Sequence, residues 1–326
     1  MDHLDEFSSE VSVVIPMHND ADTIAQTIHS VQLQSCAVQQ IIVVDDGSND
    51  QSAAIVAEMS QLDSRIFLLH LEGNGHGPAF ARNRGVEQAT GSWVAFLDAD
   101  DRWAPDHIHF LARTLENYAA TTPNGMRHDI GMLFADFEDV YPDRRSVRAR
   151  PTLSAWPAGK PLLLEDFISI WINDRDCPVW TGAACLRRDL VIELGMFPER
   201  CRRGEDKDLW LRMISMAGAL YQPIPTAEYY RRIAGNVSSV ASLEIPCIIP
   251  TIATLSKICA PREKALLSSL RAEEKYLYAF MSWRRGQKIS WSHYMTNPLR
   301  FPILSLKIAL MSFISVGFIR RLAFWR

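Results

Sequence analysis

The chain has 326 residues, of which 48% are hydrophobic and 22% are charged, and its formal net charge is −4. This composition is typical of a globular protein with one large domain or two ordinary ones, and it excludes a disordered chain. The net charge excludes a protein that is basic over its whole surface, as a general nucleic-acid binder would be, and we expect no nucleic-acid partner.

The charge is unevenly distributed along the chain. Residues 261–326 hold twelve Lys and Arg against three Glu, a net charge of +9, and no acidic residue follows Lys275. The other 260 residues hold 22 basic and 35 acidic residues, a net charge of −13. An acidic body with a basic C-terminal region predicts two surfaces with different tasks.

In chain order, the first hundred residues alternate β-branched runs with helical patterns. Strands are predicted at residues 11–16, 41–44, 66–70 and 93–97. The segments between them have helical spacing, as in Ile24, Ile28 and Val31, and the last of these helices is predicted at 78–89. Such alternation predicts a mostly parallel sheet with helices on both faces.

The rest of the chain is less regular. We expect a helix at 104–118, a strand at 132–141 and a helix at 205–217. Residues 142–165 are rich in Pro and Arg and are interpreted as a surface loop. The basic region after residue 240 is expected to be helical.

Six cysteines are present, and none forms a CxxC pair, so the sequence gives no support for a zinc site or a redox motif. The N-terminal stretch is acidic and lacks the apolar segment of a secretory signal. We therefore expect a cytoplasmic location, in which the cysteines are free thiols.

Acidic residues follow two of the predicted strands. Asp45 and Asp46 come after the second strand, and Asp98, Asp100 and Asp101 after the fourth. Ligands of open parallel sheets bind outside the carboxyl ends of the strands. Clustered carboxylates repel one another unless a cation is present, and Mg²⁺ and Mn²⁺ prefer oxygen ligands. A solvated turn is the alternative for an isolated DxD, and the position after a buried strand disfavours it.

The glycine-bearing segment at 73–85 matches neither the GxGxxG pattern after a first strand nor GxxxxGK[ST], so it is not a Rossmann or Walker loop. Its backbone amides and Arg82 either face an anionic diphosphate or form an ordinary capped loop.

Six segments together resemble the family 2 glycosyltransferases, which have the nucleotide-sugar-binding GT-A fold. They occur in the order and spacing of that family and cover roughly residues 11–235. The segments are VSVVIPMHND, IIVVDDGSND, GPAFARNRG, FLDADD, TGAACLRRDL with GMFPE, and GEDKDLWLRM.

The resemblance implies an α/β GT-A fold and an inverting transfer from a nucleoside-diphosphate sugar to an acceptor hydroxyl. The donor-binding residues that it implies are Pro16, Asp45, Asp46, Arg82 and Asp98, with Asp98 near the ribose. Asp100 would hold a divalent cation, Mn²⁺ or Mg²⁺, that bridges the diphosphate. Asp101 would act through water or cap the next helix.

The same resemblance assigns the catalytic and acceptor side. Asp206 would be the general base, with Glu205 beside it to orient or bind the acceptor, although carboxylates at a helix N-terminus are also explained by the helix dipole alone. Thr181 and Gly182 would form part of the acceptor wall.

Several aromatic and histidine residues have a plainer interpretation. For Trp103, Trp180 and Trp210 we favour packing in the core over stacking on a sugar. His18, His70 and His76 are interpreted as surface or loop residues.

One departure from the family concerns the metal site. Relatives often carry a His near the end of this domain that completes it, and this chain has Ile233 there. A non-catalytic nucleotide-sugar-binding subunit therefore stays open as an alternative. A nucleotidyltransferase would need a basic Gly-rich loop after the first strand, where this chain has HNDADT.

We expect residues 1–240 to form the catalytic domain and 241–326 a helical, basic extension. Segment 301–319 is apolar and flanked by arginines. It is expected to lie on an anionic membrane surface, and packing against the catalytic domain is the alternative. The expected partners are a UDP-sugar and a sugar or lipid-linked acceptor, at the cytoplasmic face of a membrane, in the synthesis of cell-surface polysaccharide or glycolipid.

Overall fold

The computed structural model describes residues 7–73, 75–122, 129–201, 203–231, 246–284, 294 and 301–313. Ile233, the proposed boundary at residue 240 and residues 314–319 lie outside the described residues, so the expectations placed there stay predictions.

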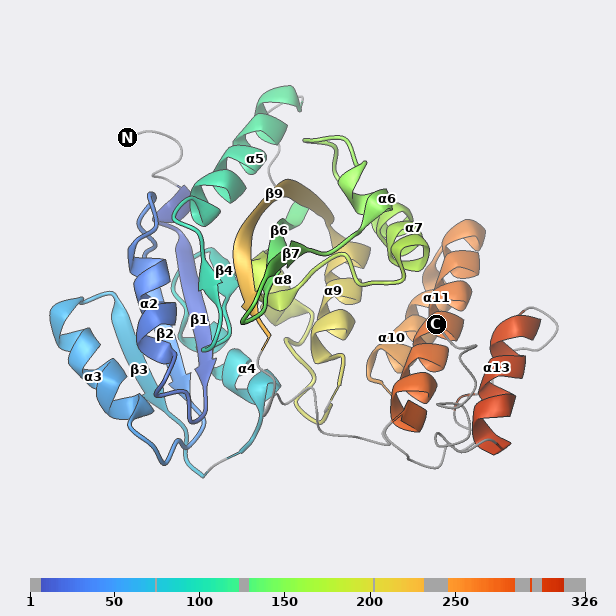
Figure 1. Ribbon diagram of the computed structural model, residues 1–326. Coiled ribbons are helices and arrows are strands. Elements are labelled where there is room, and N and C mark those ends of the chain that lie inside the picture. The colour runs from blue at the N-terminus through green and yellow to red at the C-terminus, as the bar shows by residue number, and fades with distance from the viewer. Residues whose placement is uncertain are drawn as a thin grey trace.

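The described residues form a nine-stranded sheet with helices on both faces (Figure 1). The strands are β1 Val11–Met17, β2 Gln40–Asp45, β3 Ile66–His70, β4 Trp93–Phe96, β5 Arg102–Trp103, β6 Ile130–Val140, β7 Arg145–Val147, β8 Ala184–Arg187 and β9 Gly218–Tyr230. The helices are α2 Ile24–Gln32, α3 Ser52–Leu62, α4 Pro78–Gln88, α5 His107–Thr121, α6 Pro151–Ser154, α7 Leu164–Asp174, α8 Arg188–Glu193, α9 Glu205–Met216, α10 Ile248–Ile258, α11 Pro261–Arg284 and α13 Pro302–Phe313.

The strand order is β3-β2-β1-β4-β8-β6-β9-β5, with β7 paired to β6. Strands β1 to β4 are parallel to one another, β8 is antiparallel to both of its neighbours, and β6 and β9 are parallel. Most strands therefore run in one direction, and the prediction of a mostly parallel α/β fold is confirmed. The carboxyl ends of β1, β2 and β4 lie at one edge, which is where the acidic segments leave the sheet.

Alternating side chains of each inner strand pack into two different cores, as the two-residue period of a strand requires. Val13 of β1 packs with the face covered by α2, α3 and α5. Val14 packs with the opposite face, which α4, α7, α9, α10 and α11 cover. Residues of α10 and α11 belong to this second core, so these C-terminal helices pack directly against the sheet-bearing part of the chain.

The segment at 142–165 differs from the prediction of a surface loop. It contains strand β7 and helix α6, and the Arg150 side chain is buried. Arg150 donates hydrogen bonds to the Asp136 carboxylate and to the carbonyl of Pro178. A buried arginine is stable here because a carboxylate and a carbonyl receive its donors, and sequence composition does not reveal such partners.

The expectation of free thiols is wrong for two cysteines. Cys201 and Cys247 form a disulfide across 46 residues, with their Cα atoms 5.9 Å apart. Disulfide pairing depends on this spatial distance, which the spacing in the sequence does not give. The remaining cysteines form no disulfide: Cys36, Cys177, Cys185 and Cys259.

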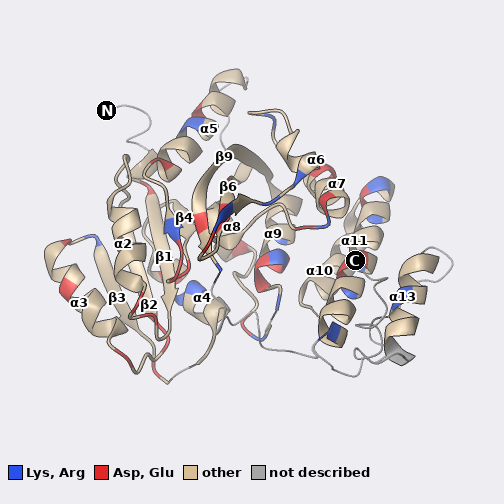
Figure 2. Ribbon diagram, viewed as in Figure 1, with Lys and Arg blue, Asp and Glu red and all other residues tan. Residues whose placement is uncertain are grey.

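Helix α13 packs on α11 through a small separate cluster that includes Tyr278, Trp283, Ile308 and Met311. Among the described residues, no helix combines the length and the apolar character needed to cross a membrane. Figure 2 shows Lys and Arg recurring along α11 and acidic residues in the segment that follows β2.

Candidate active site

The donor-side carboxylates at the end of β2 are buried and already hydrogen-bonded. Asp45 accepts a hydrogen bond from the amide of Ser48 and lies 3.1 Å from His70 Nδ1. Asp46 accepts from the amide of Gly77 at 2.8 Å, and its other oxygen lies 2.7 Å from His76 Nδ1. The two histidines are exposed loop or strand-end residues, as expected, but their contacts with these carboxylates could not be read from the sequence.

The segment at 73–77 reaches Asp46 because its backbone turns sharply. Gly73, Gly75 and Gly77 have φ angles of 84°, 73° and 97°, a region that favours glycine. This geometry brings the amides of His76 and Gly77 to the Asp46 carboxylate. The glycine-bearing segment thus contacts the predicted nucleotide pocket through Asp46, next to Pro16, which pairs with Val44 in the β1–β2 register.

Arg82 lies between the donor side and the catalytic side. Its Nη2 donates to Asp98 Oδ1 at 2.6 Å, and its Nη1 lies 3.5 Å from Glu205 Oε1. The side chain is 6% exposed and stacks over the Phe197 ring. Although burial disfavours its charge, Asp98 and Glu205 raise the pKa of Arg82, so the guanidinium stays charged. Arg82 of α4 therefore joins the end of β4 to the first turn of α9.

Glu205 and Asp206 begin α9, after Gly204 in a left-handed conformation. Burial, followed by the neighbouring charge of Asp206, raises the pKa of Glu205 to about 7, while Arg82 opposes this effect. Asp206 Oδ2 accepts a hydrogen bond from Thr181 Oγ1 at 3.3 Å. The structure thus brings together five of the predicted residues in a line, from Asp98 through Arg82 to the Glu205–Asp206 pair and Thr181.

Gly182 is required by the packing of an aromatic ring. A Cβ atom added there would lie 2.3 Å from the nearest atom of the Trp180 ring. Trp180 is partly exposed and stacks on Tyr229, with the ring centroids 5.0 Å apart. Trp103 and Trp210 are buried, which confirms core packing for both. Trp103 Nε1 donates to the carbonyl of Gly182, so this hydrogen bond holds the backbone of one residue of the predicted acceptor wall.

The carboxylates after β4 divide into an exposed and a buried group. Asp98 is 31% exposed at its side chain, whereas Asp101 is fully buried. Asp101 Oδ1 accepts from the amide of Tyr230, and its Oδ2 has no hydrogen-bond partner among the described residues. Burial, then Asp98 and Asp100, raise the pKa of Asp101 well above its usual range. Asp101 thus binds the backbone of β9, and the residue that precedes α5 is Asp106, so Asp101 does not cap that helix.

The donor set suits a hard cation that also binds a diphosphate. Within the described part of the chain, no group of three or more His, Cys, Asp or Glu side chains is arranged to hold a metal ion. Mg²⁺ and Mn²⁺ are commonly bound by one or two carboxylates and substrate phosphates. Asp98 and Asp100 add, after burial, to the raised pKa of Asp101, and a cation at Asp100 would offset the repulsion between these carboxylates.

A separate cavity of about 490 Å³ opens at the opposite edge of the sheet, where β6 and β9 begin. Ile130, Leu163, Met216 and Gly218 line it, and none of the predicted site residues does. The candidate active site is therefore not this cavity.

Comparison with known proteins identifies a related family for the first part of the chain and supports the fold over most of it. Residues 12–155 match the family described as glycosyl transferase family 2. The chain is 44% identical over 98 residues to a putative teichuronic acid biosynthesis glycosyltransferase, TuaG, of Bacillus subtilis, a match that covers 30% of this chain and 38% of that protein. It is 40% identical over 99 residues to the succinoglycan biosynthesis protein ExoO of Rhizobium meliloti, covering 30% of this chain and 28% of that protein. The chain thus spans well under half the length of these two relatives.

Solved structures of glycosyltransferases share the fold over nearly the whole chain. The TarS 1–349 structure from S. aureus, in complex with UDP-GlcNAc, has a TM-score of 0.67 at 18% identity and covers 92% of this chain and 79% of that chain. A mannosyltransferase from Pyrobaculum calidifontis in complex with GDP-Man and Mn²⁺ has a TM-score of 0.57 at 16% identity, covering 98% and 89%. The GT-A fold is confirmed.

Proposed function

We propose that the chain is an inverting glycosyltransferase. Its residues 12–155 match the family described as glycosyl transferase family 2, and its fold is that of solved GT-A glycosyltransferases. It transfers a sugar from a nucleoside-diphosphate sugar to an acceptor hydroxyl. The observation that carries this proposal is the line of contacts from Asp98 through Arg82 to Glu205, with Asp206 next in the chain. Arg82 alone therefore links Asp98, the proposed nucleotide-binding carboxylate, to Glu205, the neighbour of the candidate general base.

The proposed mechanism uses the chain's own residues. Asp206 Oδ2 accepts the proton of the acceptor hydroxyl, and Thr181 Oγ1, 3.3 Å away, orients that carboxylate. The acceptor oxygen forms a bond to the anomeric carbon as the bond to the diphosphate breaks on the opposite face, so the configuration inverts. Arg82, buried and charged, faces the departing diphosphate and Glu205.

Pro16, Asp45 and Asp46 are proposed to bind the nucleoside, and Asp98 the ribose. Asp100, together with diphosphate oxygens, would hold a Mn²⁺ or Mg²⁺ ion, whose chemistry when bound is to neutralise charge on the leaving group. Thr181 and Gly182 are proposed to form the acceptor wall. A UDP-sugar is the proposed donor, consistent with a structural neighbour that binds UDP-GlcNAc.

The names of the relatives concern teichuronic acid and succinoglycan synthesis, and they support a role in making cell-surface polysaccharide or glycolipid. We propose that the chain acts at the cytoplasmic face of a membrane, where anionic lipids attract basic segments such as 261–326.

The test is a donor panel. The purified chain is incubated with Mn²⁺ and with UDP-GlcNAc, other UDP-sugars and GDP-Man, and the released nucleoside diphosphate is measured with and without bacterial membranes as acceptor. We expect turnover of one donor, its loss on adding EDTA, and a loss of cation-dependent donor affinity in Asp100→Ala. Donor binding without turnover of any nucleotide sugar would instead support the non-catalytic subunit.

A further inference from the structure

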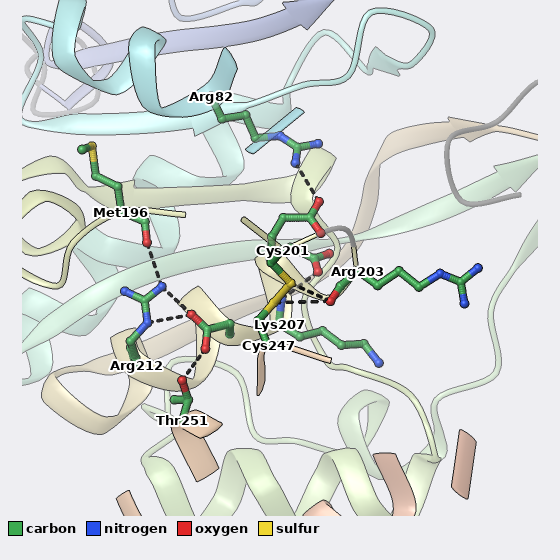
Figure 3. Close-up of a disulfide and its surroundings, with 11 residues drawn as sticks. Arg82, Met196, Cys201, Arg203, Lys207, Arg212, Cys247 and Thr251 are labelled. Carbon is green, nitrogen blue, oxygen red and sulfur yellow. Dashed lines mark hydrogen bonds and ion pairs between the residues drawn. A yellow bond between two sulfur atoms is a disulfide. The ribbon is translucent and has the colours of Figure 1, made fainter. Parts of the chain in front are cut away.

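The first turn of α9 is held by the C-terminal helices. Lys207, the residue after Asp206, places its Nζ 3.0 and 3.1 Å from the two carboxylate oxygens of Glu274 on α11. Successive helical residues project about 100° apart, so Lys207 leaves the helix in a different direction from Asp206. Figure 3 shows the Lys207 side chain extending away from Arg82. Lys207 thus connects this turn to Glu274 of α11, which lies 67 residues further along the chain.

The Lys207–Glu274 ion pair is largely buried, so it can hold the first turn of α9 in one orientation. The side chains of Lys207 and Glu274 are 19% and 3% exposed. Burial disfavours the charge of Lys207, but Glu274 and Tyr278 raise its pKa, so the ammonium stays charged. Breaking a buried pair by removing one partner leaves an uncompensated charge, whereas exposed pairs break at little cost. The pair therefore resists rotation of the turn more than a surface contact would.

Two further contacts hold the same turn. Asp208, 4% exposed, accepts hydrogen bonds from Arg212 on its own helix and from Thr251 on α10 (Figure 3). The Cys201–Cys247 disulfide joins the segment before α9 to the residue that precedes α10. Contacts with α10 and α11 therefore hold the chain both before and after Glu205 and Asp206.

Few contacts orient the Asp206 carboxylate directly. Its Oδ2 is 3.3 Å from Thr181 Oγ1, and its Oδ1 accepts from the backbone amide of Lys207. Within the described residues, the Asp206 carboxylate makes no ion pair. The direction of this carboxylate consequently depends on the backbone of the turn, which its neighbours fix.

We propose that Lys207 and Glu274 are positioning residues for the reaction at Asp206, which makes the C-terminal helices part of the catalytic apparatus. The inference rests on the proposed function. Neither residue contacts the predicted donor or acceptor groups. Their ion pair sets the rotation of the α9 turn, so that the Asp206 carboxylate faces Thr181 and the acceptor side.

The test compares Lys207→Met, Glu274→Gln and the double variant Lys207→Met/Glu274→Met with the wild-type chain. Misplacement of a catalytic group by about 1 Å lowers rates by up to about 100-fold, so we expect kcat to fall at least about tenfold in each. KM for the donor should change less than about twofold. The double variant removes both charges, so it retains the fold and still shows the fall in kcat. Lys207→Arg, which keeps the charge, should recover part of the rate.

The matched control is Arg262→Gln. Arg262 of α11 also makes an ion pair with another helix, but its partner is Glu165 on α7 and not a residue of α9. It should keep the wild-type kcat. Amide hydrogen exchange of the peptide at 203–211 gives a readout independent of the donor, and exchange should be faster in the Lys207 and Glu274 variants than in the control.

Two results would overturn the inference. One is a wild-type kcat in the folded double variant; the other is unchanged exchange at 203–211. A wild-type chain that turns over no donor would instead refute the proposed function, and the exchange measurement would still report whether the pair orders the turn.

Discussion

At the scale of single residues, the site is organised by groups whose charges are set by burial. Arg82 is kept charged by Asp98 and Glu205, whereas burial raises the pKa of Glu205 to about 7. Near neutral pH, Glu205 is thus divided between its neutral and charged forms while Arg82 is not. A carboxyl group in this state can donate a hydrogen bond to an acceptor hydroxyl as well as accept one.

The raised pKa of Glu205 makes a prediction about stability. Its folded pKa of about 7 exceeds the reference value of 4.5, so between these values the folded state binds more protons than the unfolded state. The contribution of Glu205 to the free energy of unfolding therefore decreases as the pH rises from about 4.5 to about 7. Glu205→Gln removes this decrease, and we expect it to gain on the order of 1–3 kcal/mol relative to wild type between pH 5 and pH 8.

Urea unfolding at both pH values measures this difference. The control is Glu87→Gln, on the exposed surface of α4, where Glu87 pairs with Arg84. It should follow the wild-type pH dependence. An identical pH dependence in Glu205→Gln and wild type would refute the assignment of a neutral Glu205.

The residue scale also shows what the sequence cannot supply. The carboxylates after β2 and β4 could be placed at one edge because parallel strands end there together. The contact of Asp46 with His76 could not, because it depends on how the glycine-bearing segment turns, and the contact of Asp45 with His70 requires the register of β2 and β3. The Lys207–Glu274 pair joins residues far apart in sequence, so no local sequence pattern predicts it.

At the scale of elements, the strands and helices with strong periodicity were predictable. The strand at 66–70 was placed at its observed bounds, and the helix at 78–89 ends one residue later than α4. Prediction was wrong at 142–165, where composition indicated a loop and the structure has β7 and α6. Short elements such as these form because tertiary contacts hold them, here the buried Arg150 with Asp136, and their own sequences contain too few residues to show a period.

Helix α13 makes a prediction that belongs to this scale. Ile308 and Met311 face α11, while Ile303, Leu306 and Leu310 are 69%, 61% and 37% exposed. The exposed residues have helical spacing, so they form an apolar stripe in a basic region. We expect the chain to bind vesicles that contain anionic lipid more tightly than neutral vesicles, and Leu306→Glu to weaken this binding about tenfold.

Co-sedimentation with vesicles at low and high salt is the measurement. Leu62→Glu changes an equally apolar and 90% exposed residue at the end of α3, far from the basic region in sequence, and serves as the control. Equal vesicle binding by wild type and Leu306→Glu would contradict a membrane role for α13 and favour the alternative, packing against the protein.

At the scale of the whole molecule, the chain brings together parts that are distant in sequence. The family match ends at residue 155, and three residues of the proposed site, Thr181, Glu205 and Asp206, lie beyond it. The likeness to TarS covers 92% of the chain and so includes this second half. The uneven charge, −13 over residues 1–260 against +9 over residues 261–326, separates the part of the chain that forms the sheet from the C-terminal region. Helices α10 and α11 join these two parts through a shared core.

The central claim is that Asp206 is the general base of a glycosyl transfer, and Asp206→Asn tests it most directly. The variant keeps the shape of the side chain and removes its ability to accept a proton. Donor affinity is measured by calorimetry with Mn²⁺, and transfer by product formation, with Asp189→Asn on the exposed surface of α8 as the control. General acid–base groups contribute about 10²- to 10⁴-fold to rates, so we expect transfer to fall by at least about 100-fold while the donor Kd changes less than about twofold. Transfer by Asp206→Asn at the wild-type rate would contradict the claim.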